Sequence, residues 1–244
     1  MHFCDDQIAK IIENDSISEF QRIISQTNLS IDSKIKLNQE VYYILPTTSP
    51  TLIEYAMFFN SIEIFKFLLL NNARMDNLNS PCFAIAGGSY DIIHILEQQN
   101  IISPQNAHHL NSFIISAIRY HRNEIADYLI DSLGFCFDFE TLAASIRYNN
   151  YDAFVKSVPV LRVNPNQRGS EFETAMYTCV NFGRLEFLKF LSHIDGIDFN
   201  VKSISVEWSP LHLAASYNQL EVIKYLCSMT SEEEIKKQKI SSNL

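Results

Sequence analysis

One stretch near the C-terminus decides the fold: Ser209-Pro-Leu-His-Leu-Ala-Ala215, followed after two residues by Asn218-Gln-Leu-Glu-Val-Ile-Lys-Tyr-Leu226. Its leading serine is a residue type that caps helix N-termini, and Pro210 suits the first helical position because its φ is fixed and it lacks an N–H. Asn218 tolerates the positive φ that a tight stop between two helices requires. Glu221 then falls in the first turn of a second helix, where the helix dipole favours negative charge. The stretch therefore predicts a helix, a tight turn and another helix.

The same pattern recurs along the chain at intervals near 33 residues. An acidic residue marks each copy, at Glu19, Glu63, Asp91, Glu124, Asp152, Glu186 and Glu221. Seven positions before the acid, each copy after the first has a small residue: Ala56, Ala84, Ala117, Ser145, Cys179 or Ala214. Three positions before the acid stands a residue that tolerates positive φ: Asn60, Gly88, His121, Asn149, Gly183 or Asn218. Repeats of this length must stack, because one helix pair cannot bury its apolar face alone.

Each repeat has a predicted helix start and a predicted buried stripe. The first helices are expected to begin at caps five residues before the small position: Thr51, Asn79, Ser112, Glu140, Thr174 and Ser209. After the acid, apolar residues at spacings of one, four and five positions form one buried face of the second helix. The fifth repeat departs from this rule with Lys156 and Ser157, and Pro159 cuts its second helix short.

These columns divide the chain into an array over residues 1–229 and a charged C-terminal segment. The predicted repeats lie near residues 5–30, 50–75, 78–102, 111–134, 139–160, 173–196 and 208–229. The segment 230–244 is expected to form a solvated terminal helix that covers the last repeat. An insertion around Lys36–Ser49 lengthens the first interval, and Val41–Leu45 within it is ambiguous between a strand and a buried loop.

Composition limits the possible functions. The 244 residues are 47% hydrophobic, and 19 Lys plus Arg stand against 28 Asp plus Glu, a net charge of −9. This is a globular composition, and an acidic chain is a poor match for nucleic acid or anionic membranes. The longest apolar run, Ile64–Leu70, is broken by Lys66 and falls short of the roughly 20 residues that span a bilayer. With five widely spaced cysteines and no visible secretory signal, a soluble protein of the cytoplasm is expected.

The residues around Ser209–Leu226 closely resemble the ankyrin-repeat signature. Gly183-Arg-Leu-Glu-Phe-Leu-Lys-Phe-Leu191, after Thr174, and Ser61-Ile-Glu-Ile-Phe-Lys-Phe-Leu68, after Thr51, are similar to diverged copies. The resemblance covers about residues 5 to 230. The Ile/Asn-rich style, with Leu52-Ile-Glu-Tyr-Ala-Met-Phe-Phe59, resembles the expanded ankyrin-type proteins of parasitic protists, domains of unknown function.

The resemblance implies a non-catalytic, protein-binding scaffold or adaptor that needs no cofactor and binds through a concave face and loop tips. It also implies which residues point into that face: those just after the small position, and the one before the last cap. They include the aromatic and Arg side chains that dominate binding hot spots. The candidate partner-binding residues are Phe58, Phe59, Arg119, Tyr120, Arg147, Tyr148, Phe182, Trp208 and Tyr217.

Each candidate has a simpler structural interpretation. For the rings, the alternative is packing against a neighbouring repeat. Trp208 is the only Trp and sits in a polar loop before a cap. Arg119 and Arg147, each followed by Tyr, would stand on adjacent repeats and bind a carboxylate-bearing peptide. The alternative is solvated Arg or intramolecular pairing with Glu124 or Asp152.

Enzyme activity has no motif in this sequence. The searches for GxGxxG, GxxxxGK[ST], GxSxG, HExxH and CxxC find none. His212 matches the motif position whose imidazole binds loop backbone, and His108-His109 has no other metal ligand at short spacing, so no metal is expected. Two competing interpretations stay open: an enzyme with a dispersed site near His108, His109 and His121, or a structural subunit of a larger assembly.

The sequence thus predicts an all-α, ankyrin-like helix-turn-helix solenoid of about seven repeats. Its expected partner is another protein, neither nucleic acid nor membrane, and the chain is expected to be a monomer.

Overall fold

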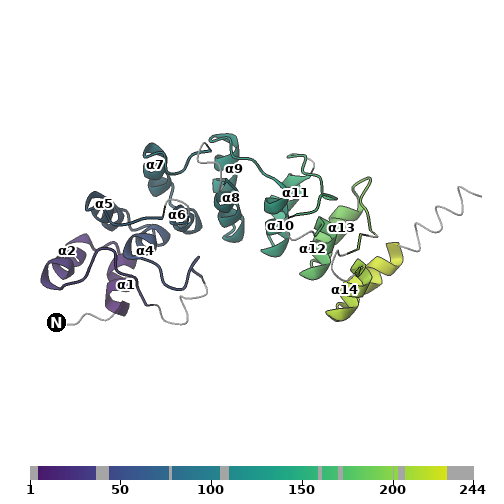
Figure 1. The fold of residues 1–244 in the computed structure, drawn as a ribbon, viewed down its shortest axis with the longest axis horizontal. Helices are drawn as coiled ribbons and strands as arrows, with labels where there is room; N and C mark the ends of the chain where they lie inside the picture. Colours follow the sequence, from purple (N-terminus) through teal and green to yellow (C-terminus); the bar gives the residue numbers. More distant parts are fainter. Residues whose placement is uncertain are drawn as a thin grey trace, which may run out of the picture. The chain divides into compact units, whose positions relative to one another are not determined.

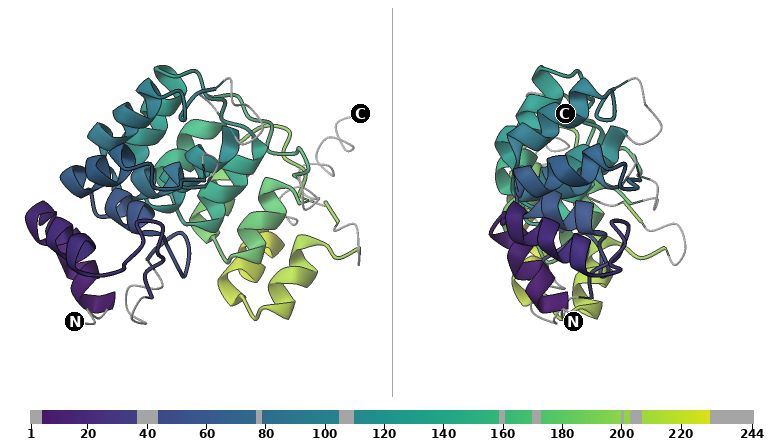
Figure 2. Two further views of the ribbon diagram at one scale, coloured as in Figure 1. Left: turned by 60° about the vertical axis from the view of Figure 1, so that its left-hand side comes forward. Right: turned by 90° about the vertical axis from the view of Figure 1, so that its left-hand side faces the viewer.

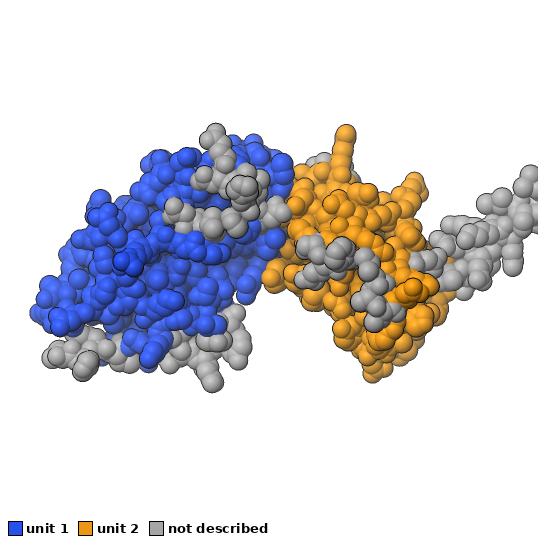
Figure 3. All heavy atoms as spheres, in the orientation of Figure 1, with its two compact units in different colours: residues 1–136 blue, residues 137–244 orange. Residues whose placement is uncertain are grey.

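The computed structural model describes residues 5–36, 44–76, 79–104, 110–158, 161–169, 173–199, 201–202 and 207–229. It divides into two compact units, residues 1–136 and 137–244 (Figure 3). Within the described residues the helices come in antiparallel pairs, each pair followed by a loop, and the only β-structure is an isolated bridge between Lys34 and Thr51. None of the described helices has the length and apolar character needed to cross a membrane.

Unit 1 consists of two rows of helices (Figures 1 and 2). The first helix of each pair lies in an inner row, and each inner helix packs against the next one along the chain. This row contains α1 (Asp5–Glu13), α4 (Leu52–Phe58), α6 (Pro81–Gly87) and α8 (Leu110–Arg119). The second helices form the outer row: α2 (Ile17–Gln26), α5 (Ile62–Leu70), α7 (Tyr90–Gln98) and α9 (Asn123–Asp131).

Unit 2 repeats this arrangement. Its inner helices are α10 (Phe139–Arg147), α12 (Ala175–Asn181) and α14 (Pro210–Ser216), and α12 packs against both of the others. Its outer helices are α11 (Tyr151–Ser157), α13 (Leu185–Ser192) and the helical residues 220–229. One core runs between the two rows, with Phe154, Cys179, Leu188 and Ala214 fully buried.

The turns between the paired helices confirm the predicted column of positive φ. The φ angles are 58° at Asn60, 84° at Gly88, 55° at His121, 60° at Asn149, 64° at Gly183 and 54° at Asn218. The column of small residues is confirmed as well: each lies on an inner helix with none of its surface exposed, from Ala56 to Ala214. Any larger side chain there would push apart helices that are already in contact.

Half of the predicted helix starts are correct. Thr51, Thr174 and Ser209 cap α4, α12 and α14, and each hydroxyl accepts a hydrogen bond from a backbone N–H three residues on. The three residues Asn79, Ser112 and Glu140 are not caps, because the loops before their helices differ in length. Ser80 precedes α6, α8 already begins at Leu110, and Asp138 caps α10.

Asp138 caps α10 through two reciprocal hydrogen bonds with Thr141, at a position two residues before the expected cap Glu140. The Thr141 N–H donates to the Asp138 carboxylate at 3.1 Å, and the Asp138 N–H donates to the Thr141 hydroxyl at 2.7 Å. This exchange satisfies two backbone donors at once and fixes the helix start, so Glu140 falls inside the first turn instead.

The fifth repeat has the shortened second helix that its sequence predicts. Helix α11 ends at Ser157 after 7 residues, whereas α5, α7 and α9 each have 9. Aromatic packing compensates: the Phe154 ring lies 4.7 Å from the Phe187 ring and 5.4 Å from the Phe190 ring, centroid to centroid. The helix is short, yet its one fully buried ring holds it against α13.

Several predictions fall outside the described residues. These are the central part of the Lys36–Ser49 insertion with most of Val41–Leu45, the pair His108-His109, and the C-terminal segment 230–244.

Candidate partner-binding surface

The surface predicted for binding lies at the C-terminal ends of the inner helices. In unit 2, Arg147 is the last residue of α10 and Tyr148 its C-cap, Phe182 is the C-cap of α12, and Tyr217 is the C-cap of α14. All three C-caps share φ near −95° and ψ near 7°, and each is followed by the positive-φ residue of its turn. One aromatic residue per repeat therefore stands at the same backbone geometry.

Two large apolar side chains at these helix ends are exposed, and so is Trp208, at the opposite, N-terminal end of α14. Phe182 has 37% of its surface exposed, Trp208 has 40% and Tyr217 has 56%. Trp208 stands just before the Ser209 cap, as predicted. Exposed large apolar side chains on a soluble domain are candidates for interaction sites where they form a common patch.

Arg147 and Tyr148 are half-buried beside this group. The Arg147 guanidinium carbon lies 5.8 Å from the centre of the Phe182 ring, a cation–π distance that ties α10 to the neighbouring inner helix α12. The contact leaves a positive charge at the edge of an aromatic surface.

Sequence reasoning missed the side chain that holds these helix ends in place. Arg184 begins the turn into α13, and its Nε and Nη2 atoms donate to the backbone carbonyls of Ile146 and Arg147, both at 3.1 Å. These carbonyls belong to the last turn of α10, where C=O groups lack the usual helical partner four residues on, although the Ile146 carbonyl also accepts from the Asn149 N–H at 3.2 Å. A guanidinium there satisfies two acceptors and opposes the negative end of the helix dipole.

Unit 1 has the same type of contact two repeats earlier in the chain. Arg122 donates from Nε to the Ala86 carbonyl at 3.0 Å and from Nη2 to the Gly87 carbonyl at 3.2 Å. In the sequence, the signal was an Arg directly after the positive-φ residue in the fourth and sixth repeats. The acceptors are backbone atoms of another repeat, so no side-chain pattern identifies them.

The predicted residues of unit 1 lie differently from those of unit 2. Phe58, Phe59 and Tyr120 are half-buried and their rings contact one another: Phe58 lies 5.2 Å from Phe59 and 6.0 Å from Tyr120, both edge to face. Arg119 is exposed, with its guanidinium carbon 5.3 Å from the centre of the Tyr120 ring. Packing between repeats therefore uses part of this aromatic surface.

A glycine makes the contact between Phe58 and Tyr120 possible. The two rings come from α4 and from the end of α8, and α6 lies between those helices. Gly87 ends α6, and a Cβ added there would lie 2.2 Å from the Phe58 carbonyl oxygen. The third repeat thus has no side chain where its neighbours have an aromatic one, and the two rings meet across the gap.

Arg119 and Arg147 belong to different compact units. The adjacent pair of guanidinium groups expected from the sequence stays a prediction, as does the shared role of all nine candidate residues in binding.

Of the three histidines that motivated the enzyme alternative, only His121 lies among the described residues, and His212 was expected to have a structural role. His212 completes the Ser209 cap, with Nδ1 2.7 Å from the Ser209 hydroxyl and 3.4 Å from the Ser209 backbone nitrogen, which agrees with the predicted backbone contact. His121 is exposed and occupies the positive-φ turn position. No group of three or more His, Cys, Asp or Glu residues suited to a metal ion occurs within the described part of the chain.

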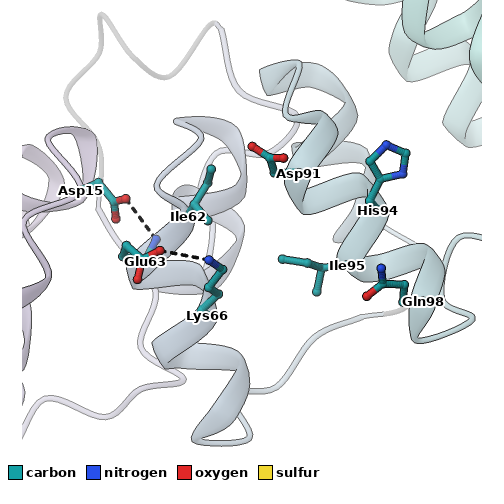
Figure 4. Close-up of a pocket in the computed structure, with 8 residues that line it drawn as sticks. All are labelled: Asp15, Ile62, Glu63, Lys66, Asp91, His94, Ile95 and Gln98. Carbon is teal, nitrogen blue, oxygen red and sulfur yellow. Dashed lines mark hydrogen bonds and ion pairs between the residues drawn. The ribbon is translucent and has the colours of Figure 1, made fainter.

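Unit 1 has an open hollow of about 560 Å³ between α5 and α7 (Figure 4). Its charged groups hold the helices: the Asp15 carboxylate accepts hydrogen bonds from the Glu63 and Ile64 N–H groups at 3.0 Å, and Lys66 pairs with Glu63 at 3.0 Å. Figure 4 shows Asp91, His94 and Gln98 along α7 on the other side. A catalytic site requires side chains that converge on one point. The side chains of this hollow do not converge in that way.

Burial suppresses the reactivity of two cysteines. It raises the pKa of the Cys82 thiol to about 11, and it raises the pKa of the fully buried Cys179 thiol well above its usual value, although Arg184 acts in the opposite direction. Because the thiolate is the nucleophile, both side chains stay neutral packing groups at pH 7.

Comparison with known proteins identifies the repeats. Residues 141–239 match the family model for ankyrin repeats, described as three copies. No curated protein matches the chain. Among solved structures, the crystal structure of the human ASB11 ankyrin repeat domain is similar with a TM-score of 0.57 and 16% sequence identity, over 91% of this chain and 96% of that one.

The similarity shows the fold, which is an all-α ankyrin-repeat solenoid. This confirms the fold class predicted from the sequence. The resemblance to proteins of parasitic protists stays a prediction.

Proposed function

We propose that the chain is a non-catalytic scaffold or adaptor that binds another protein through the inner-helix ends of unit 2. Ankyrin repeats are generally protein–protein interaction modules, which supports the class of function. The observation that carries the location is the exposure of Phe182, Trp208 and Tyr217 over consecutive repeats of one compact unit. Aromatic side chains with few rotatable bonds lose little conformational freedom when a partner covers them.

The backbone that holds this surface is fixed, which supports binding with little rearrangement. Phe182 and Tyr217 are C-cap residues, so their backbone is fixed by the helix before them and the positive-φ residue after them. The Arg184 hydrogen bonds fix the end of α10 that bears Arg147. A preorganised surface of this kind converts more of its buried area into affinity.

The charge beside the rings defines the chemistry of the partner. Arg147 is the cation at the edge of this surface, so the proposed partner segment presents apolar side chains together with a carboxylate. Phe58, Phe59, Arg119, Tyr120 and Tyr148 are proposed as further contacts. In this proposal the site needs no cofactor, and its partner is neither nucleic acid nor a membrane.

The test compares two variants with the wild-type chain in affinity purification and quantitative mass spectrometry. The surface variant carries Phe182→Ala, Trp208→Ala and Tyr217→Ala; the control carries Tyr90→Ala and Tyr151→Ala, which remove exposed rings from the outer helices α7 and α11. Truncating a binding hot spot costs about 2 kcal/mol or more, and about 1.4 kcal/mol is a tenfold change in affinity.

We therefore consider the partners that both the wild type and the control retain. The amount of these partners recovered with the surface variant should be lower by at least about tenfold. Circular dichroism and urea unfolding must show that both variants keep the fold. If the folded surface variant retains every partner, the proposed location of the site is wrong.

A further inference from the structure

We propose that the outer helices α7 and α9 of unit 1 bind a basic segment of another protein. The site, the acidic outer face, consists of Tyr90, Asp91, His94, Glu124 and Tyr128. It lies on the second helices of the third and fourth repeats, whereas the surface proposed above lies on the inner helices of unit 2. The inference therefore goes beyond the proposed function and does not depend on it.

The outer helices share a charge pattern that α7 and α9 break. In four repeats a Lys or Arg stands three positions after the acid that marks the repeat: Arg22, Lys66, Lys189 and Lys224. The three lysines pair with that acid at distances of 2.8 to 3.0 Å, and the fifth repeat has Lys156 one position later. The equivalent residues in the third and fourth repeats are His94 and Asp127. These two helices therefore lack the base that balances the acid elsewhere.

Neither α7 nor α9 contains a Lys or an Arg. Their sequences, Tyr-Asp-Ile-Ile-His-Ile-Leu-Glu-Gln and Asn-Glu-Ile-Ala-Asp-Tyr-Leu-Ile-Asp, hold five carboxylates. Two cations of neighbouring segments are engaged: Lys66 pairs with Glu63 on α5 (Figure 4), and Arg122 donates to carbonyls at the end of α6. Asp91 and Glu124 are both exposed, so their charges act on whatever approaches this side of unit 1.

Three rings lie against one another on the acidic outer face. The Tyr90 and Tyr128 ring centroids are 6.1 Å apart, edge to face, and the His94 ring lies 5.5 Å from the Tyr128 ring. The Tyr128 hydroxyl donates to the Glu97 carboxylate at 2.9 Å, so a residue of α7 holds the ring that α9 supplies. The rings are thus fixed before any partner arrives, which lowers the entropic cost of binding.

The Tyr90 ring offers an accessible surface inside a negative field. It has 38% of its surface exposed. Burial, and after it the negative charges of Glu124 and Asp127, raise the pKa of Tyr90, so the ring lies close enough to α9 to feel those carboxylates. A cation beside an aromatic ring is attracted by the ring quadrupole, and here the carboxylates act in the same direction. Ring and acids therefore favour one kind of ligand group, a Lys or Arg side chain.

Hollows on both sides of α7 leave room for a segment that crosses this helix. The hollow of about 560 Å³ between α5 and α7 is lined by Asp91 and His94 (Figure 4). A second hollow, of about 570 Å³, is lined by His94, Glu97 and Leu133. His94 thus stands between the two, and side chains of one crossing segment can enter both.

Charge selects the occupant of the acidic outer face. Its carboxylates are spread over two helices, so a segment that carries several cations matches them better than a single ion does. Nucleic acid would be repelled. The chain's own segment 231–239 has three Glu and three Lys, so it brings no net positive charge. The proposed occupant is therefore a Lys/Arg-rich segment of another protein.

The test measures binding of a short fluorescein-labelled peptide of alternating Lys and Ala to the full chain by fluorescence anisotropy at low ionic strength. The charge variant carries Asp91→Asn and Glu124→Gln. The matched control carries Glu186→Gln and Glu221→Gln, which remove the acids at the same repeat position in unit 2 and change the net charge by the same amount. Circular dichroism must show that both variants keep the fold.

We expect the dissociation constant of the peptide to rise at least about threefold for the charge variant, since two exposed ion pairs are lost. The control should raise it less than half as much. Added salt should weaken binding to the wild type, because it screens exposed charges.

A second pair of variants tests the ring. Tyr90→Leu keeps an apolar side chain but removes the ring face, so the dissociation constant should rise about twofold to fivefold, whereas Tyr90→Phe should leave it unchanged. Benzoylphenylalanine at Gln98, an exposed residue that lines both hollows, should cross-link the peptide on irradiation, and at Tyr151 it should not. This cross-link is decisive even if the charge variant fails to fold.

Three results would overturn the proposal. The first is a control that weakens binding as much as the charge variant does, because the peptide would then respond to net charge alone. The second is equal binding by Tyr90→Leu and the wild type, together with no cross-link at position 98. The third is a chain without residues 230–244 that binds the peptide at least about threefold more tightly, which would assign the acidic outer face to the chain's own C-terminal segment.

Discussion

Replacing Gly87 by Ala tests the close approach of the inner helices α4 and α6. In most helices this change is favourable, because Ala has a higher helix propensity than Gly by about 1 kcal/mol. Gly87 is the last residue of α6, and its φ is not in the left-handed region, so the new methyl group meets no strain from its own backbone. The outcome depends on what the methyl group touches.

The contacts at this position are all backbone atoms. A Cβ at residue 87 would lie 2.2 Å from the Phe58 carbonyl oxygen, 2.8 Å from the Phe58 carbonyl carbon and 2.9 Å from the Met57 carbonyl oxygen. To reach 3.0 Å, the shortest of these must lengthen by 0.8 Å, the difference between 3.0 and 2.2 Å. Backbone cannot rotate away as a side chain can, so the two helices must separate.

Overpacking of this kind costs about 1 to 3 kcal/mol, and a clash with a carbonyl group belongs at the upper end. After the gain in helix propensity of about 1 kcal/mol, we expect Gly87→Ala to destabilise the fold by about 2 kcal/mol. Separation of α4 from α6 should also loosen the Phe58–Tyr120 ring contact, which lies across this position.

Urea unfolding followed by circular dichroism measures the change. Gly134→Ala is the control, because Gly134 has φ of 75° and no atom within 4 Å of an added Cβ, so only backbone strain of about 1 kcal/mol applies. Near-ultraviolet circular dichroism reports the aromatic contact, which the control should leave unchanged. A Gly87→Ala chain as stable as the wild type, or more stable, would refute the close packing of α4 on α6.

Three further predictions concern single groups. Arg184→Ala should lower the free energy of unfolding by about 2 kcal/mol, because two carbonyls at the end of α10 lose a charged donor. Arg184→Lys should restore less than half of that loss, because an ammonium group lacks the two-pronged geometry of a guanidinium. Urea unfolding measures both changes. The Cys136 thiol should react with an aromatic disulfide reagent at pH 8 within minutes, whereas the buried Cys179, whose pKa is raised, should react only on unfolding, as mass spectrometry of labelled peptides would show. Burial and a 2.6 Å hydrogen bond donated to Glu13 raise the pKa of Tyr55, so its contribution to stability is complete below about pH 10 and is lost as the pH rises further. Between pH 9 and 11, the free energy of unfolding should therefore decrease less for Tyr55→Phe than for the wild type.

The predictable part of the fold is the part set by local backbone chemistry. The turn after each inner helix requires a positive φ, and only a few residue types accept it, so Asn60 and Gly183 identify their turns without any knowledge of the neighbours. The small residue on each inner helix is equally direct, because contact between helices leaves room for little more than a methyl group. Both columns follow from rules that act within one repeat.

Helix starts are less predictable because loop length varies from repeat to repeat. Asp138 caps α10 two residues before the expected Glu140, since the reciprocal bonds with Thr141 are available only from that position. A fixed offset from the small residue cannot anticipate which nearby side chain makes such a pair. The cap predictions succeed at Thr51 and Thr174, where the hydroxyl at the expected offset accepts the backbone N–H three residues on.

Contacts between repeats are the part that the sequence does not reveal. Arg184 binds backbone carbonyls 37 and 38 residues earlier, and backbone atoms have no sequence signature. The contact of Phe58 with Tyr120 depends on the absence of a side chain at Gly87, in a repeat that lies between them. The aromatic candidates looked equivalent in the sequence, and only the packing separates the half-buried rings, which include Tyr148, from the exposed rings of Phe182 and Tyr217.

Site-specific photo-cross-linking tests the proposed binding surface most directly. Benzoylphenylalanine is introduced at Tyr217 on the inner-helix end of α14 or, as the control, at Tyr151 on the outer helix α11; both native rings are exposed. After irradiation in lysate, we predict a discrete covalent partner at position 217 that is absent at position 151 and is lost when Phe182 and Trp208 are changed to Ala. Equal products at the two positions, or a product only at 151, would contradict the assignment of this surface.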